Sequence, residues 1–201
     1  MFTEQQVKWL KRVEDLFLRY GIKSISMDDV ARELGISKKT LYQFVDSKDD
    51  LVNKMLERHI DEEKKQCDQL FHVAGNAVEE MFLVIDNNAQ QLQQMKANIV
   101  YDLQKYHRDA WEMIRDFQRS FLYTIIRKNL ERGISEGLYR SDINVDIVAK
   151  MHIALSFQMF DEDIFPQNAY PKAGLFREFL LHYLYGIVSD KGLQLLKAKL
   201  S

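Results

Sequence analysis

A short stretch between residues 37 and 48 carries hydroxyl, amide and cationic side chains whose chemistry suits nucleic acid. Lysines in this stretch can contact phosphate oxygens, and such contacts supply affinity and register more than sequence reading. Gln43 can form two hydrogen bonds with adenine in the major groove, so it is a candidate base reader. With one serine from the start of the preceding helix, the candidate DNA-binding residues are Ser26, Ser37, Lys38, Lys39, Thr40, Tyr42, Gln43 and Lys48.

These residues also have plainer interpretations. Each one taken alone can be an ordinary surface residue, and Ser26 can serve only to cap its own helix. A hydroxyl at the start of a helix can instead contact a DNA phosphate. The clustering of cations, hydroxyls and an amide in one short stretch favours nucleic acid as the partner of the group.

Two short helices separated by a glycine are predicted to position these side chains. Val30 and Leu34 lie four residues apart on one face of the first helix, which Ser26 precedes as a candidate N-cap. Gly35 then ends this helix, because glycine adopts the left-handed conformation of a C-terminal cap without steric cost.

The second helix is predicted to begin directly after Ser37, whose hydroxyl is typical of an N-cap. Leu41 and Phe44, three residues apart, form its buried stripe. The basic and polar residues between them therefore lie on or beside its exposed side. Residues 27–48 as a whole have the pattern of a helix-turn-helix that binds DNA.

The whole chain is predicted to be all-α. Its 201 residues are 46% hydrophobic and include only two prolines, and alternation of β-branched residues is nearly absent. One long helix is expected from Arg108 to about Glu136. The net charge of −2 argues against a generally basic surface, so any DNA contact must come from a local patch.

Other classes of protein find little support. Cys67 is the only cysteine and cannot form a disulfide within the chain, and no apolar run approaches the roughly 18 residues of a membrane span. Neither a signal segment nor a glycine-rich phosphate loop nor a Cys/His zinc cluster is recognisable. We therefore expect a soluble cytoplasmic protein that is not an enzyme, with no metal, no cofactor and no membrane partner.

The N-terminal quarter of the chain resembles a known family. The matching residues are Ile25, Ser26 and Met27, then Val30 and Ala31, then 34–44 (LGISKKTLYQF), and finally 47–51 (SKDDL). Together they look like the N-terminal signature of the tetracycline-repressor (TetR) family of bacterial transcription regulators. Val45 departs from the pattern, because relatives often carry a second aromatic residue there.

The resemblance implies a domain organisation. An N-terminal three-helix helix-turn-helix DNA-binding domain, placed at residues 1–47, is followed by a larger helical effector-binding and dimerisation domain at residues 48–201. By similarity to the family, Tyr42 is the strongest candidate among the hydroxyls that donate to phosphate. A homodimer of such chains binds a palindromic double-stranded operator, with two recognition helices in major grooves about 34–36 Å apart or a multiple of that spacing.

The remainder of the chain offers candidates for a pocket. Aromatic and methionine side chains in the second half can line a cavity for a small apolar or aromatic effector, because such cavities are built largely from these residues. The same stripe can also be plain core. His107 and His152 are candidate polar contacts within such a pocket. The candidate pocket residues are Trp111, Met113, Phe117, Tyr123, Phe157 and Met159.

Two helices expected after residue 142 have broad apolar faces. These faces can pack against their copies across a twofold axis into a four-helix interface, as the resemblance also implies. Alternatively, both are buried within one chain. The candidate interface residues are Ile147, Met151, Leu155, Phe176, Phe179, Leu180, Tyr183 and Leu184.

Residues and resemblance together favour a ligand-responsive repressor that binds DNA as a homodimer and is released by an effector. The alternative is a non-catalytic, all-helical scaffold or partner-binding protein. That alternative leaves the lysines and hydroxyls between Ser37 and Lys48 without an explanation.

Overall fold

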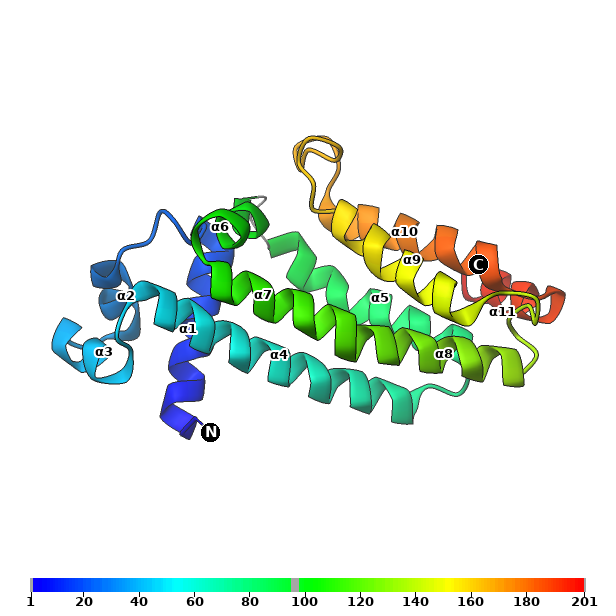
Figure 1. Cartoon of the computed structure of the whole chain (residues 1–201), viewed down its shortest axis with the longest axis horizontal. Coiled ribbons are helices and arrows are strands. Elements are labelled where there is room, and N and C mark those ends of the chain that lie inside the picture. Colours follow the sequence, from blue (N-terminus) through cyan, green and yellow to red (C-terminus); the bar gives the residue numbers. More distant parts are fainter. Residues whose placement is uncertain (1, 95–97, 201) are drawn as a thin grey trace. The chain divides into compact units, whose positions relative to one another are not determined.

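A computed structural model of the protein describes residues 2–94 and 98–200, and for Leu70, 88–94 and Asn98 it describes the backbone alone. Helices dominate the described residues (Figure 1), whose β-type pairing is an isolated antiparallel bridge between Tyr139 and Val188. The prediction of an all-α fold is confirmed. Within the described ranges, no helix is long and apolar enough to cross a membrane.

The chain forms two compact units, and α4 (Lys48–Val73) runs from one into the other. The first unit contains Met1–Glu63 and Gln94–Asp116, and the second contains Lys64–Gln93 and Phe117–Ser201. The expected domain boundary after residue 47 lies at the start of α4, whereas the division by compactness falls within α4. A functional boundary at residue 47 stays a prediction.

The first unit is built from short helices that pack around the start of α4. Its buried apolar side chains include Leu10, Val13 and Phe17 of α1 and Leu51 of α4. Besides the first part of α4, the helices of this unit are α1 (Glu4–Tyr20), α2 (Met27–Leu34), α3 (Lys38–Phe44), α6 (Asn98–Tyr106) and α7 (Arg108–Phe117).

Side-chain caps fix the ends of α1 and α2. Thr3 and Gln6 form a capping box at the start of α1, and Ser26 forms a second one with Asp29 at the start of α2. Gly35 ends α2 in the left-handed conformation, with φ of 70°. The caps expected at Ser26 and Gly35 are therefore confirmed.

The second unit is a bundle of longer helices with one continuous apolar core. In it α9 packs against both α8 and α10 (Figure 1). Besides the end of α4, its elements are α5 (Ala77–Gln94), the π-helix η1 (Gln118–Leu122), α8 (Tyr123–Ser135), α9 (Val145–Gln158), α10 (Lys172–Ile187) and α11 (Asp190–Leu200).

A buried tyrosine organises the core of this bundle. The hydroxyl of Tyr139 lies 3.0 Å from the carbonyl oxygen of Ala77 and 3.0 Å from the side-chain oxygen of Asn129. Its ring packs directly on Gly133, where an added Cβ would come within 2.0 Å of a ring carbon. Any larger residue at 133 would therefore displace the ring and its hydrogen bonds.

The long helix expected from Arg108 to about Glu136 contains a π-helical turn. α7 leads into η1, and α8 follows without a break in the chain direction. Within η1 the backbone N–H of Tyr123 donates to the carbonyl oxygen of Gln118, five residues earlier. The side chains of Phe117 and Phe121 stack across this turn, with ring centroids 5.4 Å apart.

Candidate nucleic-acid interface and ligand pocket

Apolar contacts hold α3 by one side. Leu41 is completely buried, and the half-buried ring of Phe44 contacts Phe2 and Trp9 with centroid separations of 6.5 and 6.0 Å. Helices of seven residues are not stable alone, so α3 depends on these anchors for its position. The opposite side of α3 is thereby fixed toward solvent.

The exposed side of α3 carries the candidate DNA-binding residues. Ser37 caps the helix by accepting a hydrogen bond from the backbone N–H of Thr40 at 3.0 Å, and the two hydroxyls lie 2.8 Å apart. Lys39 and Gln43 are exposed, and Tyr42 keeps 44% of its surface accessible. Hydroxyls, an amide and a cation thus share one solvent-facing surface, as the sequence predicts.

The two neighbouring lysines differ in their partners. Lys38 forms an ion pair with Asp28 of α2 at 3.0 Å, and this hydrogen bond raises the pKa of Lys38. Lys39 has no ion-pair partner among the described residues. A phosphate would have to compete with Asp28 for Lys38, whereas it would meet Lys39 unpaired.

The hydroxyl of Ser26 forms hydrogen bonds within the cap of its own helix, α2. Its hydroxyl donates to the Asp29 carboxylate at 2.6 Å and accepts from the backbone N–H of Asp29 at 3.2 Å. The pKa of Asp29 is lowered most strongly by the bond from the Ser26 hydroxyl, and also by a bond that the backbone N–H of Ser26 donates to the same carboxylate. Capping therefore accounts for Ser26 without DNA, and its phosphate contact stays a prediction.

Lys48 has backbone partners that the sequence did not indicate. Its ammonium group donates to the carbonyl oxygens of Ile22 and Ile25, both at 2.6 Å. The side chain is half-buried, and burial lowers the pKa of Lys48 against the opposing charges of Asp102 and Asp49. Two of its three donor hydrogens thus fix the loop between α1 and α2, which leaves at most one for a phosphate.

Helix α6 also holds this loop, through residues that sequence analysis did not single out. The buried carboxylate of Asp102 accepts from the backbone N–H of Lys23 at 2.9 Å. The ammonium of Lys23 in turn lies 3.1 Å from the hydroxyl of Tyr106. Beside them, His107 pairs with Asp49 at 2.5 Å rather than lining a cavity. In the sequence, Asp102 is recognisable only as an acidic residue on an amphipathic helix, and this does not indicate its contact with Lys23.

A charged cluster joins α1 to α4. Glu14, which is 9% exposed, forms ion pairs with Arg58 and with His59, the latter at 2.6 Å. Burial opposes ionisation of Glu14, but the hydrogen bonds and positive charges of His59 and Arg58 outweigh it and lower the pKa. Likewise, burial opposes protonation of His59, but the hydrogen bond with Glu14 outweighs it and raises the pKa.

The six residues predicted to line an effector pocket are divided between the two compact units. Trp111 and Met113 belong to the first compact unit, whereas Phe117, Tyr123, Phe157 and Met159 belong to the second. Met159 is buried, with 6% of its surface exposed. Of the six, only Tyr123 lines the cavity described next.

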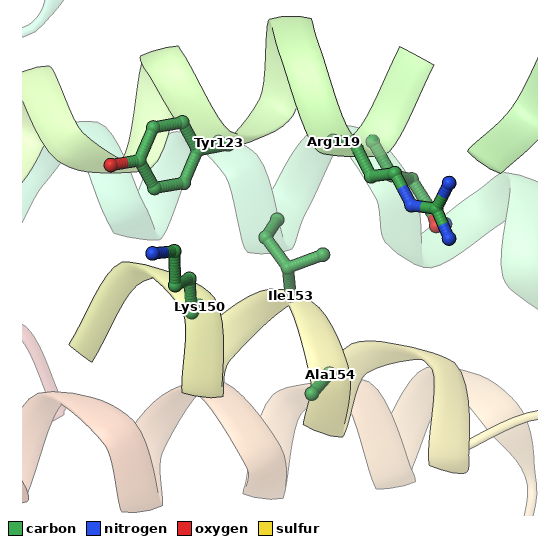
Figure 2. A pocket seen from close by; sticks show the side chains of 6 residues that line it. Arg119, Tyr123, Lys150, Ile153 and Ala154 are labelled. Carbon is green, nitrogen blue, oxygen red and sulfur yellow. The ribbon is translucent and has the colours of Figure 1, made fainter. Parts of the chain in front are cut away.

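The cavity lies between η1–α8 and α9 and has a volume of about 350 Å³. In Figure 2, Ile153 points from α9 toward η1–α8, with Tyr123 and Arg119 on either side of it. Its lining residues are Gln118, Arg119, Tyr123, Lys150, Ile153 and Ala154. Apart from Tyr123, sequence analysis named none of these, because the walls come from helices brought together by packing.

Hydrogen bonds connect the side chains at one end of this cavity. The hydroxyl of Tyr123 donates to Asp146 at 2.6 Å, and the ammonium of Lys150 lies 2.8 Å from the other oxygen of the same carboxylate. The opposite end is less satisfied: the side-chain oxygen of Gln118 is buried without a hydrogen-bond partner among the described residues. No group of three or more His, Cys, Asp or Glu side chains in the described ranges is arranged to hold a metal ion.

The predicted interface residues divide into exposed and buried ones. Ile147, Met151 and Leu155 follow one another at four-residue spacing on α9 and are 53%, 56% and 47% exposed. Leu180 and Leu184 are instead core residues of the single chain, at 1% and 0% exposure. They offer no surface to a second copy. The partly buried remainder are Phe176, Phe179 and Tyr183.

His152 lies on the inner side of α9. Its ring contacts those of Phe179 and Tyr183, at centroid separations of 4.9 and 4.4 Å. Burial lowers the pKa of His152 to about 4 and raises the pKa of Tyr183. The Nδ1 atom of His152 and the hydroxyl of Tyr183 are both buried without a hydrogen-bond partner among the described residues. Burial therefore favours the neutral form of the His152 ring.

Comparison with known proteins places these features in context. Residues 10–55 match the family model described as "Bacterial regulatory proteins, tetR family". The chain is 29% identical over 170 residues to the uncharacterized HTH-type transcriptional regulator YvaF of Bacillus subtilis (strain 168), covering 84% of this chain and 88% of that one. It is 26% identical over 148 residues to the HTH-type transcriptional repressor KstR2 of Mycolicibacterium smegmatis, with 69% of each chain covered.

Solved structures show the same fold. The reduced form of NemR from E. coli superimposes with a TM-score of 0.75 at 15% sequence identity, covering 93% of this chain and 98% of that one. Because the coverage of both chains is nearly complete, the likeness includes the helical bundle as well as the N-terminal helices.

Proposed function

Because the chain belongs to the TetR family of bacterial transcription regulators, we propose that it is a repressor released from DNA by a small molecule. As a transcription regulator it is not an enzyme. In this proposal, a homodimer binds a palindromic operator in the cytoplasm, where bacterial DNA lies. One observation carries the proposal: the polar side of α3 faces solvent while Leu41 and Phe44 anchor the other side.

Each residue on that side of α3 has a proposed role. Tyr42 and Ser37 donate hydrogen bonds to phosphates, and Lys39 supplies a cation that has no ion-pair partner among the residues described. Gln43 reads a base edge in the major groove. Because the chain as a whole carries a net charge of −2, attraction to DNA has to come from this local surface, presented twice by a dimer.

The dimer is proposed to form through α9 and α10. Ile147, Met151 and Leu155 leave an apolar stripe on α9 that nothing within the described chain covers. Exposed apolar stripes of this kind mark contacts with another protein surface. A twofold axis would place the stripe against its own copy, with α10 beside it, in a four-helix arrangement.

Release is proposed to work through a shift of populations. Residues 1–47 act as the reading head, and residues 48–201 hold the effector and the dimer contact. An effector that binds more tightly to a dimer with wrongly spaced reading heads removes the protein from DNA. The family relation to a transcriptional repressor supports this direction of control.

A gel-shift assay tests the proposal. The purified protein is titrated against the DNA upstream of its own gene and against a random duplex of equal length, at two salt concentrations. We expect a shift of the upstream fragment that weakens as salt rises, because phosphate contacts release counterions. Equal and weak binding to both duplexes, by a protein that is folded and dimeric, would contradict the proposal.

The dimer contact has its own test. Met151→Glu places a charge in the middle of the α9 stripe, and sedimentation should then report a monomer where the wild type is a dimer. Val73→Glu, at a residue that is 75% exposed on α4, is the matched control and should stay dimeric. A dimeric Met151→Glu variant would move the interface elsewhere.

A further inference from the structure

We propose that the cavity between η1–α8 and α9 binds a small organic anion with an apolar body, whose head group pairs with Arg119. The inference rests on the proposed function in one respect: this anion would be the effector that release from DNA requires. The binding itself is a property of the second compact unit and is argued from that unit alone.

The middle of the cavity suits an apolar body. The side chain of Ile153 projects into it from α9, next to Ala154, and the ring of Tyr123 faces it from α8 (Figure 2). A volume of about 350 Å³ lies within the range of small-molecule sites, which are mostly apolar with a few placed polar groups.

The two ends of the cavity differ in charge. At the Tyr123 end, both oxygens of Asp146 are engaged by Tyr123 and Lys150, so the carboxylate and the ammonium neutralise each other. At the other end, the guanidinium of Arg119 has no ion-pair partner among the described residues. Arg119 is exposed, so the uncompensated positive charge lies at the edge of a largely apolar cavity. A planar guanidinium is well matched to a carboxylate, which it can bind through two parallel hydrogen bonds.

The π-helical turn explains why these groups share one wall. In η1 the i→i+5 hydrogen bond from Tyr123 to Gln118 stacks residues five apart along the helix axis, whereas an α-helix would turn them away from each other. Gln118, Arg119 and Tyr123 therefore all reach the cavity. Single π-helical turns recur at functional sites, and the buried oxygen of Gln118 has no donor in the part of the chain that the structure describes.

Two other occupants fit less well. A cation would seek Asp146, but Lys150 and Tyr123 already satisfy that carboxylate. Side chains of a second copy would be expected to cover the exposed stripe of α9, and they would leave Arg119 without a partner. Charge complementarity therefore favours a small anion over both.

Calorimetric titration with three probes of the same chain length tests the inference. Octanoate, octylammonium and octan-1-ol share an apolar body and differ in head-group charge. We expect octanoate to bind the wild-type protein, and the ammonium and the alcohol to bind at least about 10-fold more weakly, since a charged hydrogen bond is lost. Tighter binding of octylammonium, equal binding of all three, or no binding of octanoate would overturn the inference.

Two variants then locate the site. Arg119→Gln removes the charge and keeps an amide, and should weaken octanoate binding about 10- to 100-fold. Lys128→Gln removes an exposed cation on α8 outside the cavity and should leave binding unchanged. Unaltered binding by Arg119→Gln, or an equal loss in both variants, would remove Arg119 from the site.

A gel shift with octanoate separates this inference from the proposed function. Binding that depends on Arg119 without release of DNA supports the site and contradicts the proposed effector control. DNA binding by a protein that takes up none of the three probes overturns the site and leaves the repressor proposal standing. Release of DNA by octanoate in the wild type but not in Arg119→Gln supports both.

Discussion

The N-terminal helices differ from the contact between α9 and α10 in whether the polar side chains have partners. In α2 and α3, the hydroxyls of Ser26 and Ser37 each satisfy a backbone N–H at the start of a helix. In α9 and α10, His152 and Tyr183 bury polar atoms that have no partner among the described residues. Both regions use caps and apolar anchors, because Asn144 caps α9 in the same way, but the contact between α9 and α10 also buries these two unsatisfied polar groups.

This difference has a functional meaning. The side chains that read DNA must be held in fixed positions relative to one another. Helices of seven and eight residues need caps and apolar anchors to hold them so. A bundle that takes up a ligand gains from polar groups that are not yet engaged, since a ligand or a water molecule can satisfy them.

The largest expected effect separates the two sides of α3. Leu41→Ala should lower the free energy of unfolding by about 3 kcal/mol, because it leaves a cavity at a fully buried position. Tyr42→Ala, one residue further and exposed, should change it by less than about 0.5 kcal/mol. Urea titration measures both. Equal losses would show that α3 is not anchored on one side only.

Lys48→Met should come next in size. The substitution keeps the aliphatic part of the side chain but removes two charged hydrogen bonds to loop carbonyls, so we expect a loss of about 2 kcal/mol. Lys39→Gln should leave stability unchanged and instead flatten the salt dependence of DNA binding by about one unit per half-site. The reverse result, with Lys48→Met flattening the salt dependence at unchanged stability, would favour Lys48 over Lys39 as the phosphate contact.

Two further substitutions should differ in their effect on stability, and only the first should lower it. Ser37→Ala removes a cap and should cost about 1 kcal/mol. Tyr183→Phe removes a buried hydroxyl without a described partner and should be neutral or stabilising by up to about 1 kcal/mol. Thermal unfolding of each variant against the wild type gives the sign. A clear loss in Tyr183→Phe would mean that the hydroxyl is hydrogen-bonded in solution, most simply to water.

The smallest expected effect is a pH dependence. Because the pKa of His59 is raised in the folded protein, its contribution is complete below the ordinary value of about 6.5 and is lost as pH rises through the folded value. The pKa of Glu14 is lowered, so its contribution is complete above the ordinary value and is lost as pH falls through the folded one. Arg58 and Glu63 are the other charged groups of this cluster.

Urea titrations of the wild type and His59→Gln test this pH dependence. The difference in unfolding free energy between the two proteins should be largest near pH 6 and should shrink toward pH 9. If the difference in unfolding free energy grew with pH, the pKa of His59 would be lowered in the folded protein and not raised. His72→Gln, at an exposed end of α4, is the control and should show no such trend.

The comparison also shows what can be predicted from this sequence. Caps at Ser26, Gly35 and Ser37 act within about four residues, so a local pattern is enough to locate them. The partners of Lys48 lie 23 and 26 residues away, and Asp102 meets a backbone N–H 79 residues away. Contacts of that range depend on packing, which leaves no mark in a short window of sequence.

The spacing of apolar residues did not decide between core and dimer interface, for a related reason. A stripe on a helix shows that a face is covered, but not whether the cover comes from the same chain or from a copy. Leu180 and Leu184 proved to be covered within the chain, whereas Met151 is not. The cavity escaped prediction because a π-helical turn shapes its wall, and residues 118–122 have no pattern that distinguishes them from an ordinary helix.

The most direct measurement is the affinity of the wild type and of Gln43→Ala for the operator and for a random duplex of equal length, at one fixed salt concentration. A residue that reads a base edge contributes to the operator alone. We expect Gln43→Ala to bind the operator at least about 10-fold more weakly and the random duplex as well as the wild type does. An equal loss on both duplexes, or no loss on either, would contradict the assignment of the exposed side of α3 as the surface that reads DNA.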